Sequence, residues 1–403
     1  MSADPQVAGD DDLVSRPPKR RRPRSPTLGE EFDPRNNALN AWRLVLASGV
    51  ILWHSWPVTG RHLLFGPAHQ LLGNVWVDGF FAISGFLITW SWFRRPRVRD
   101  YFLARSLRIL PGLWVCLIVT AFVIAPIAVT VQGGSAATLL LSRAPFEYVL
   151  KNSAVTIFQP GIGGTPRGVP LSGVWNGSLW TLVWEMLCYI AVAGLGIAGL
   201  LHRRWLIPAL LAFALYLSVK LTPYAIFEDA PPDQWQHIDA ATVKLITDGI
   251  AARFALMFLA GALLCRFRNV IPARWSLVAV SLVIVLGGSL LPNYRVIAAI
   301  PLAYAVVVSG ALLHHKRMRL ETDVSYGIYI YAFPVQQLLV MCGLAFVNPF
   351  VFTVIAAIFT LPLAMLSWFL VEKPAVSLKS RLKRQSPAPI GEHRFGPPRT
   401  RQS

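Results

Sequence analysis

Three ionisable side chains inside apolar stretches are the residues of this chain best suited to chemistry. His54, Asp78 and Glu185 each interrupt a run of hydrophobic residues. An acid or base in the interior of a bilayer costs free energy and is normally retained for a function or a partner. A carboxylate beside a histidine fixes the tautomer of the ring and raises its basicity, as a general base requires. A structural polar cluster that holds helices together is the alternative.

Arg43 and His54 lie eleven residues apart in the first apolar stretch. On a helix they return to within about 20° of the same face and stand about 16 Å apart along the axis. We expect Arg43 near the inner end of this stripe and His54 near the outer end, with Asp78 and Glu185 at a depth similar to that of His54. Alternatively, Arg43 extends to lipid head groups and His54 is an interfacial residue.

Arg105 and Arg108 precede the third apolar stretch with a spacing of three residues. On a helix this spacing places both side chains on one face. Two guanidinium groups suit a phosphorylated ligand, because each can donate charge-assisted hydrogen bonds to phosphate. With Arg43 they form a candidate binding group on the cytoplasmic side. Charge that merely orients the protein in the membrane is the alternative.

The composition places the chain among polytopic membrane proteins. It is 54% hydrophobic and only 14% charged, whereas soluble domains carry about 25% charged residues. The net charge of +18 comes from basic residues gathered in short loops and at both ends, which indicates membrane orientation rather than nucleic-acid binding. The four cysteines lie in apolar runs without ligand-like spacing, so we expect no metal site: Cys116, Cys188, Cys265 and Cys342.

Ten apolar stretches approach the roughly 20 residues that a membrane helix needs. The polar segments between them alternate between basic and poorly basic, which predicts an all-α bundle of about ten transmembrane helices with both termini cytoplasmic. The predicted spans are 40–57, 72–93, 107–131, 178–200, 205–222, 249–267, 274–291, 295–313, 323–343 and 347–371.

The chain divides into three parts. Residues 1–38 are rich in proline and arginine and predict a disordered basic cytoplasmic arm, with no cleavable signal peptide. Residues 39–374 form the transmembrane domain, and 375–403 form a basic cytoplasmic tail. The long outside loop 132–177 is either a lid or acceptor-binding element or a solvated spacer.

Several motifs, in order, resemble the acyltransferase-3 family of bacterial integral-membrane O-acyltransferases. Each motif is weak alone, and their order along nearly the whole membrane region is specific. They are Arg43-x10-His54, VDGFFAISGFLI (77–88) with Asp78, Ser84 and Gly85, YFLARSLRILP (101–111) with Arg105, Arg108 and Pro111, SLWTLVWEMLCY (178–189) with Glu185, VSYGIYIYAFPV (324–335) and SWFLVEKP (367–374).

Two positions depart from the family pattern. Asn40 stands where many members have Asp, and Ala332 stands where many have His. The second departure leaves His54 as the catalytic histidine that the resemblance implies, with Asp78 or Glu185 as its carboxylate partner. Which of the two pairs with His54 is left open by the sequence.

The resemblance implies transfer of an acyl group, often acetyl, from a cytoplasmic acyl-CoA donor. Arg43, Arg105 and Arg108 would bind this donor, and no permanent cofactor is implied. The acceptor would be a hydroxyl on an extracytoplasmic or membrane-linked glycan or glycolipid, with a trehalose mycolate as one candidate. The protein would sit in the bacterial plasma membrane, in contact with membrane lipids.

Two other functions compete with this interpretation. In a glycolipid or proton-coupled transporter, His54, Asp78 and Glu185 would form a relay. In a non-catalytic scaffold, the polar groups would only hold helices together. The arginine-rich loop 94–106, predicted to lie inside, favours the transferase, because an activated phosphorylated donor needs an inner binding site and a proton relay does not.

Overall fold

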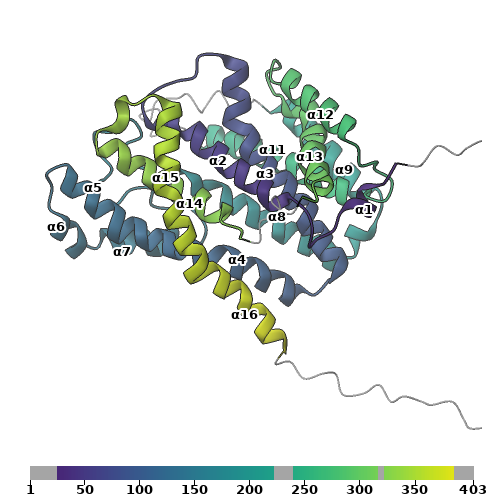
Figure 1. Cartoon of the computed structure of the whole chain (residues 1–403), viewed down its shortest axis with the longest axis horizontal. Coiled ribbons are helices and arrows are strands. Elements are labelled where there is room, and N and C mark those ends of the chain that lie inside the picture. The colour runs from purple at the N-terminus through teal and green to yellow at the C-terminus, as the bar shows by residue number, and fades with distance from the viewer. Residues whose placement is uncertain (1–24, 222–238, 316–321, 385–403) are drawn as a thin grey trace, which may run out of the picture.

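The computed structural model describes residues 25–221, 239–315 and 322–384, and Figure 1 shows their arrangement. These ranges are helical and contain no β-strand, which confirms the all-α class. Helices α5, α6 and α7 gather on one side of the bundle in Figure 1, whereas α9, α12 and α13 lie on the other.

A helix lies at each of the ten predicted stretches. The helices are α1 (Leu28–Glu31), α2 (Leu39–Val58), α3 (Gly66–Arg94), α4 (Val98–Val119), α5 (Ala125–Val131), α6 (Ala136–Leu141), α7 (Ala144–Asn152), α8 (Trp180–Ile197), α9 (Leu206–Lys220), α11 (Ala240–Arg266), α12 (Trp275–Gly288), α13 (Arg295–Leu312), α14 (Ser325–Met341), α15 (Pro349–Ser367) and α16 (Lys373–Arg384).

Within the described ranges, six helical segments are long and apolar enough to cross a membrane. α9 and α12 are apolar but shorter. α2 and α14 do not belong to the six, and α14 is buried along almost its whole length. A helix inside a bundle meets protein instead of lipid, so it can carry more polar residues. The total of ten spans therefore stays a prediction. The six segments are Gly66–Arg94, Val98–Val131, Gly177–Ile197, Ala241–Arg266, Arg295–Leu312 and Pro349–Leu378.

The outer surface carries many exposed large hydrophobic side chains. On α15, Phe350, Ile358 and Phe359 are each more than half exposed, and Val283 on α12 is 67% exposed. A water-soluble monomer seldom exposes so much apolar surface, but a membrane protein exposes it to lipid tails. The bundle is therefore built to be surrounded by hydrocarbon.

Residues 25–38 are folded, although the sequence assigns them to a disordered arm. Leu28 in α1 is fully buried, and the ring of Phe32 meets the ring of Phe86 edge to face at 4.9 Å. These apolar contacts secure the segment, so the expected disordered arm does not include it. Residues 1–24 lie outside the described part of the chain.

At the other end, the predicted tail begins inside α16 and is helical to Arg384. α15 runs into α16 through a π-helical segment, Trp368–Glu372, so the two form one long rod. The last predicted span thus continues beyond the apolar stretch. Residues 385–403 lie outside the described ranges.

Two glycines let α3 and α11 pack with their backbones nearly touching. A Cβ added at Gly85 would come within 1.9 Å of the carbonyl oxygen of Phe258, and one at Gly261 within 1.9 Å of that of Ala82. Small residues permit this close approach between membrane helices. The contact fixes the rotation of α3 against α11, and it therefore fixes the direction in which their polar side chains point.

We predict that Gly85→Ala or Gly261→Ala destabilises the protein. The added methyl group meets backbone that cannot move aside, and overpacking of this kind typically costs about 1–3 kcal/mol. Thermal unfolding of the detergent-solubilised protein measures the loss. Gly194→Ala is the matched control, because a Cβ there has no neighbour within 4 Å. Equal stability of all three variants would contradict the close packing.

Candidate active site

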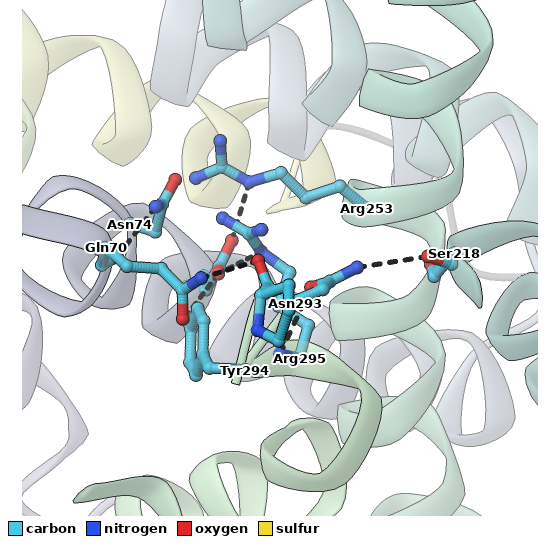
Figure 2. A network of polar contacts seen from close by, with 9 residues as sticks. Gln70, Asn74, Ser218, Arg253, Asn293, Tyr294 and Arg295 are labelled. Atoms are coloured by element: carbon cyan, nitrogen blue, oxygen red, sulfur yellow. Dashed lines mark hydrogen bonds and ion pairs between the residues drawn. The ribbon is translucent and has the colours of Figure 1, made fainter. Parts of the chain in front are cut away.

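Asp78 lies at the centre of a fully buried ionic cluster between α3, α11 and α13. Its Oδ1 accepts a hydrogen bond from Arg253 Nε at 3.0 Å, and its Oδ2 accepts one from Arg295 Nε at 2.6 Å. The hydroxyl of Tyr294 also donates to Oδ2. Figure 2 shows Arg253 and Arg295 entering this cluster. Both carboxylate oxygens of Asp78 are thus occupied by donors from other helices.

The sequence interpretation did not include the two arginines that hold Asp78. Arg253 lies inside the predicted span 249–267, and Arg295 lies at the start of the span 295–313. A charged residue inside an apolar stretch is itself a signal that a partner is near. The same signal that drew attention to Asp78 was therefore present at Arg253 and Arg295.

His54 lies on α2 and, within the described residues, has no hydrogen bond to the carboxylates that were expected to orient it. Its ring meets the ring of Phe333 edge to face, with centroids 5.0 Å apart. Its Nδ1 is buried and has no hydrogen-bond partner within the described residues. Asp78 is held by arginines, and Glu185 is bound by Ser84 and a tyrosine. No hydrogen bond in the described part of the chain joins the predicted trio into a relay.

On the side predicted to be cytoplasmic, Arg43 and Arg108 share the carboxylate of Asp323. Arg43 Nη1 lies 3.3 Å from Asp323 Oδ2, and Arg108 Nη2 donates to the same oxygen. Ser325 donates to the other oxygen at 2.5 Å. Two residues that the sequence assigned to one binding group, from α2 and α4, thus lie side by side. Asp323 was not among the predicted residues, although it opens the ninth apolar stretch.

A narrow cavity brings both of these arginines together with Glu185; the empty space within it amounts to about 630 Å³ when the open solvent at its mouth is included. Its walls come from five helices, α2, α3, α4, α8 and α14. It is lined by Arg43, Val77, Phe80, Phe81, Ser84, Arg108, Ile109, Thr181, Leu182, Glu185, Tyr189, Ser325, Tyr326 and Tyr329.

Glu185 is held in this cavity by neutral hydroxyl groups. Its Oε1 accepts hydrogen bonds from Ser84 Oγ at 3.1 Å and from the hydroxyl of Tyr189, which lies one turn further along α8. Neutral donors fix the orientation of a carboxylate without neutralising its charge. The cavity wall therefore carries two guanidinium groups and one oriented carboxylate.

Arg105 lies beside the cavity and does not line it. Its guanidinium group stands over the ring of Tyr101 at 4.6 Å and near the ring of Tyr189 at 6.0 Å. Tyr189 itself lines the cavity. Arg105 is thus separated from the cavity by an aromatic side chain, unlike Arg108 on the same helix.

Comparison with known proteins decides the family. The acyltransferase domain family matches residues 36–369, most of the chain. The chain belongs to this family. An O-acetyl transferase of Shigella phage Sf6 is 28% identical over 362 residues, which span 84% of this chain and 96% of the relative. Nodulation protein 10 of Rhizobium leguminosarum bv. viciae is 27% identical over 377 residues, 88% of this chain and 96% of the relative. No solved structure matches significantly.

The protein is thus a membrane O-acyltransferase. The family match covers α2 to α15, including every candidate site residue from Arg43 to Glu185. The fold and the enzyme class that the motifs indicated are both confirmed. The roles of the individual site residues stay predictions.

We predict that Asp78→Asn destabilises the acyltransferase, because it leaves two buried guanidinium groups without their carboxylate. Breaking a buried ion pair typically costs about 3–5 kcal/mol. Thermal unfolding of the solubilised enzyme checks this, with Glu185→Gln as the control, since the hydrogen bonds that Glu185 accepts from the described residues come from neutral hydroxyls. An inactive Asp78→Asn variant with wild-type stability would instead place Asp78 in the chemistry.

Proposed function

We propose that this acyltransferase moves an acyl group, acetyl in the simplest case, from cytoplasmic acyl-CoA to a hydroxyl of an extracytoplasmic or membrane-linked glycan or glycolipid. The observation that carries the proposal is the cavity that joins Arg43 and Arg108 to Glu185. The cationic groups face the donor, and the carboxylate lies on the path toward the acceptor. The plasma membrane is the compartment that gives access to both substrates.

The cationic wall supports an anionic donor. Arg43 and Arg108 come from different helices and are held in place by Asp323, so little side-chain entropy is lost when a ligand binds them. A guanidinium group donates several hydrogen bonds in a fixed fork, and Asp323 uses only part of that capacity. The aromatic residues Phe80 and Tyr326 provide apolar walls for the uncharged part of the donor.

His54 is the proposed general base. It takes the proton of the acceptor hydroxyl while the oxygen attacks the thioester carbonyl carbon. The carbon–sulfur bond then breaks, and the CoA thiolate leaves and takes up a proton. Histidine suits this step because its unperturbed pKa of about 6.5 leaves it largely neutral at pH 7. A positioned base typically contributes about 10²–10⁴-fold to the rate.

Glu185 is the carboxylate that we assign to the transfer step. Both oxygens of Asp78 are bound by donors from α11 and α13, whereas Glu185 lines the cavity with one oxygen held by hydroxyls. A fixed carboxylate in this position can accept a hydrogen bond from the acceptor and orient it. Asp78 then stabilises the packing of α3 against α11 and α13 and takes no part in the transfer step.

The acceptor class rests on the relatives and on the membrane location. A similar protein from Shigella phage Sf6 is named O-acetyl transferase, and this supports acetyl as the transferred group. A trehalose mycolate is one candidate among lipid-linked acceptors. Mass spectrometry of envelope glycans and glycolipids from cells with and without the protein identifies the acceptor by the loss of one acyl mass. An unchanged envelope would count against transfer to such an acceptor.

We predict that Arg43→Gln and Arg108→Gln each weaken acyl-CoA binding by the purified enzyme. A charge-assisted hydrogen bond typically contributes about 1.5–3 kcal/mol, so Kd should rise about tenfold or more. Arg105→Gln should have a smaller effect, because Arg105 stands behind Tyr189. Isothermal titration with a non-hydrolysable acyl-CoA analogue measures all three. Unchanged affinity in both Arg43→Gln and Arg108→Gln would exclude this cavity as the donor site.

We predict that His54→Ala abolishes acyl transfer but leaves insertion and donor binding intact, because His54 lies outside the cavity that holds the donor. Glu185→Gln should slow transfer and raise KM for the acceptor if Glu185 orients it. Transfer of radiolabelled acetyl to envelope lipids in membranes carrying each variant tests both. Near wild-type turnover in His54→Ala would refute the proposed base.

A further inference from the structure

A pair of contacting residues on α8 and α14 lines the donor cavity. The hydroxyls of Thr181 and Tyr329 lie 2.5 Å apart, and both residues line the cavity. The hydroxyl of Tyr329 also donates to the carbonyl oxygen of Ser178 at 2.9 Å, which fastens the segment just before α8 to α14. Among the cavity-lining residues of α8 and α14, these two lie nearest the predicted outer side.

A second contacting pair lies about one turn further outward, on α14 and on the 3₁₀ segment Gly177–Leu179 that leads into α8. Gly177 precedes Thr181 by four residues, and Phe333 follows Tyr329 by four, a step of about 6 Å along a helix. A Cβ added at Gly177 would come within 2.7 Å of Phe333 Cε2, so the ring lies directly against the glycine backbone. Phe333 is itself 4% exposed.

The same ring contacts His54. The two ring centroids are 5.0 Å apart with an interplanar angle of 81°. The order from inside to outside is therefore the Thr181–Tyr329 pair, then the Gly177–Phe333 pair, and His54 against the Phe333 ring. His54 is not among the residues that line the cavity. The ring that contacts the proposed base thus lies one turn outward of the cavity-lining residue Tyr329 on α14.

The surroundings of Phe333 are rigidly fastened. Asn176 Nδ2 donates to the carbonyl oxygen of Ile330 at 2.8 Å. Gln337 Nε2 donates to the carbonyl oxygens of Leu171 at 2.7 Å and Val174 at 2.8 Å. The end of the long outside loop is thus fixed to α14 one turn before and one turn after Phe333.

We propose that Phe333 is a gate between the donor cavity and His54, and that it also positions the imidazole ring. With the gate closed, outside water cannot reach the thioester, where its attack would break the carbon–sulfur bond and release the acyl group as a carboxylic acid together with free CoA. Rotation of the ring away from Gly177 joins the two compartments, so that a hydroxyl held at His54 reaches the thioester carbon. The catalytic part of this inference rests on the proposed function, but the barrier itself does not.

A labelling experiment tests the barrier without any activity. The four native cysteines are replaced by alanine, and Ser84→Cys places one thiol in the cavity wall. A membrane-impermeant maleimide is added outside intact cells. We expect protection when Phe333 is present and labelling several-fold faster with Phe333→Ala. Phe359→Ala on the exposed face of α15 is the matched control and should stay protected, since Phe359 is 57% exposed.

Labelling of the same thiol in inverted membrane vesicles shows whether each variant keeps its folded cavity. In such vesicles the cytoplasmic side, on which we place the opening for the donor, faces the added maleimide. If Phe333→Ala does not accumulate, Phe333→Leu retains more volume and should give intermediate outside labelling. Outside labelling that is fast with Phe333 present, or that stays slow in both Phe333 variants, would overturn the gate.

Turnover measurements then test the positioning role. With acyl-CoA and no acceptor, Phe333→Ala should hydrolyse the donor several-fold faster than the parent enzyme while its transfer to envelope lipid falls. A merely structural loss would lower both rates together and would overturn the positioning role. If the parent enzyme itself does not use acyl-CoA, the proposed function fails, and the labelling result still decides the barrier.

Discussion

Two buried guanidinium groups share the carboxylate of Asp78, and this interaction ties α3, α11 and α13 together. Charges buried in a hydrocarbon environment are tolerated only with partners at close distance, so the three helices cannot rotate or slide independently. Two of these helices, α3 and α11, are also held together by the close contact of their backbones at Gly85 and Gly261. Together they hold Ser84 on α3 where it can bind Glu185 on α8.

A second ionic cluster repeats this principle on the predicted inner side, with one difference that matters for chemistry. Asp323 also joins two arginines, but Arg43 and Arg108 line an open cavity, whereas the cluster around Asp78 is closed. In the function that we propose, the same arrangement of one carboxylate and two guanidinium groups serves structure in one place and donor binding in the other. Exposure to a cavity, and not residue type, separates the two roles.

α14 is the element on which the parts of the site meet. One face carries Tyr329 at the cavity, and Phe333 at the next turn contacts His54. Gln336 Nε2 bonds the backbone of α2 at Ile51, and Gln337 holds the outside loop. A buried helix with polar side chains can fix several neighbours at once, because each unpaired polar group would be costly in this environment. This explains why α14 is less apolar than the helices that face lipid.

The sequence by itself determined the membrane character, the all-helical class, the position of each long helix and the family. These features are local or nearly so, because apolar run length, loop charge and short motifs can each be read within one segment. It also singled out residues that meet in the cavity, Arg43, Arg108 and Glu185. It did not determine which carboxylate faces which cation.

Only the tertiary structure showed that Asp78 pairs with Arg253 and Arg295, and that Asp323 pairs with Arg43 and Arg108. It also gave His54 an aromatic neighbour where a carboxylate was expected, and it ordered residues 25–38 against the bundle. Partners such as Asp78 and Arg295 lie more than 200 residues apart. Their meeting depends on the rotation and relative depth of separate helices, which the close packing of the assembled bundle sets and the sequence of any one helix does not contain.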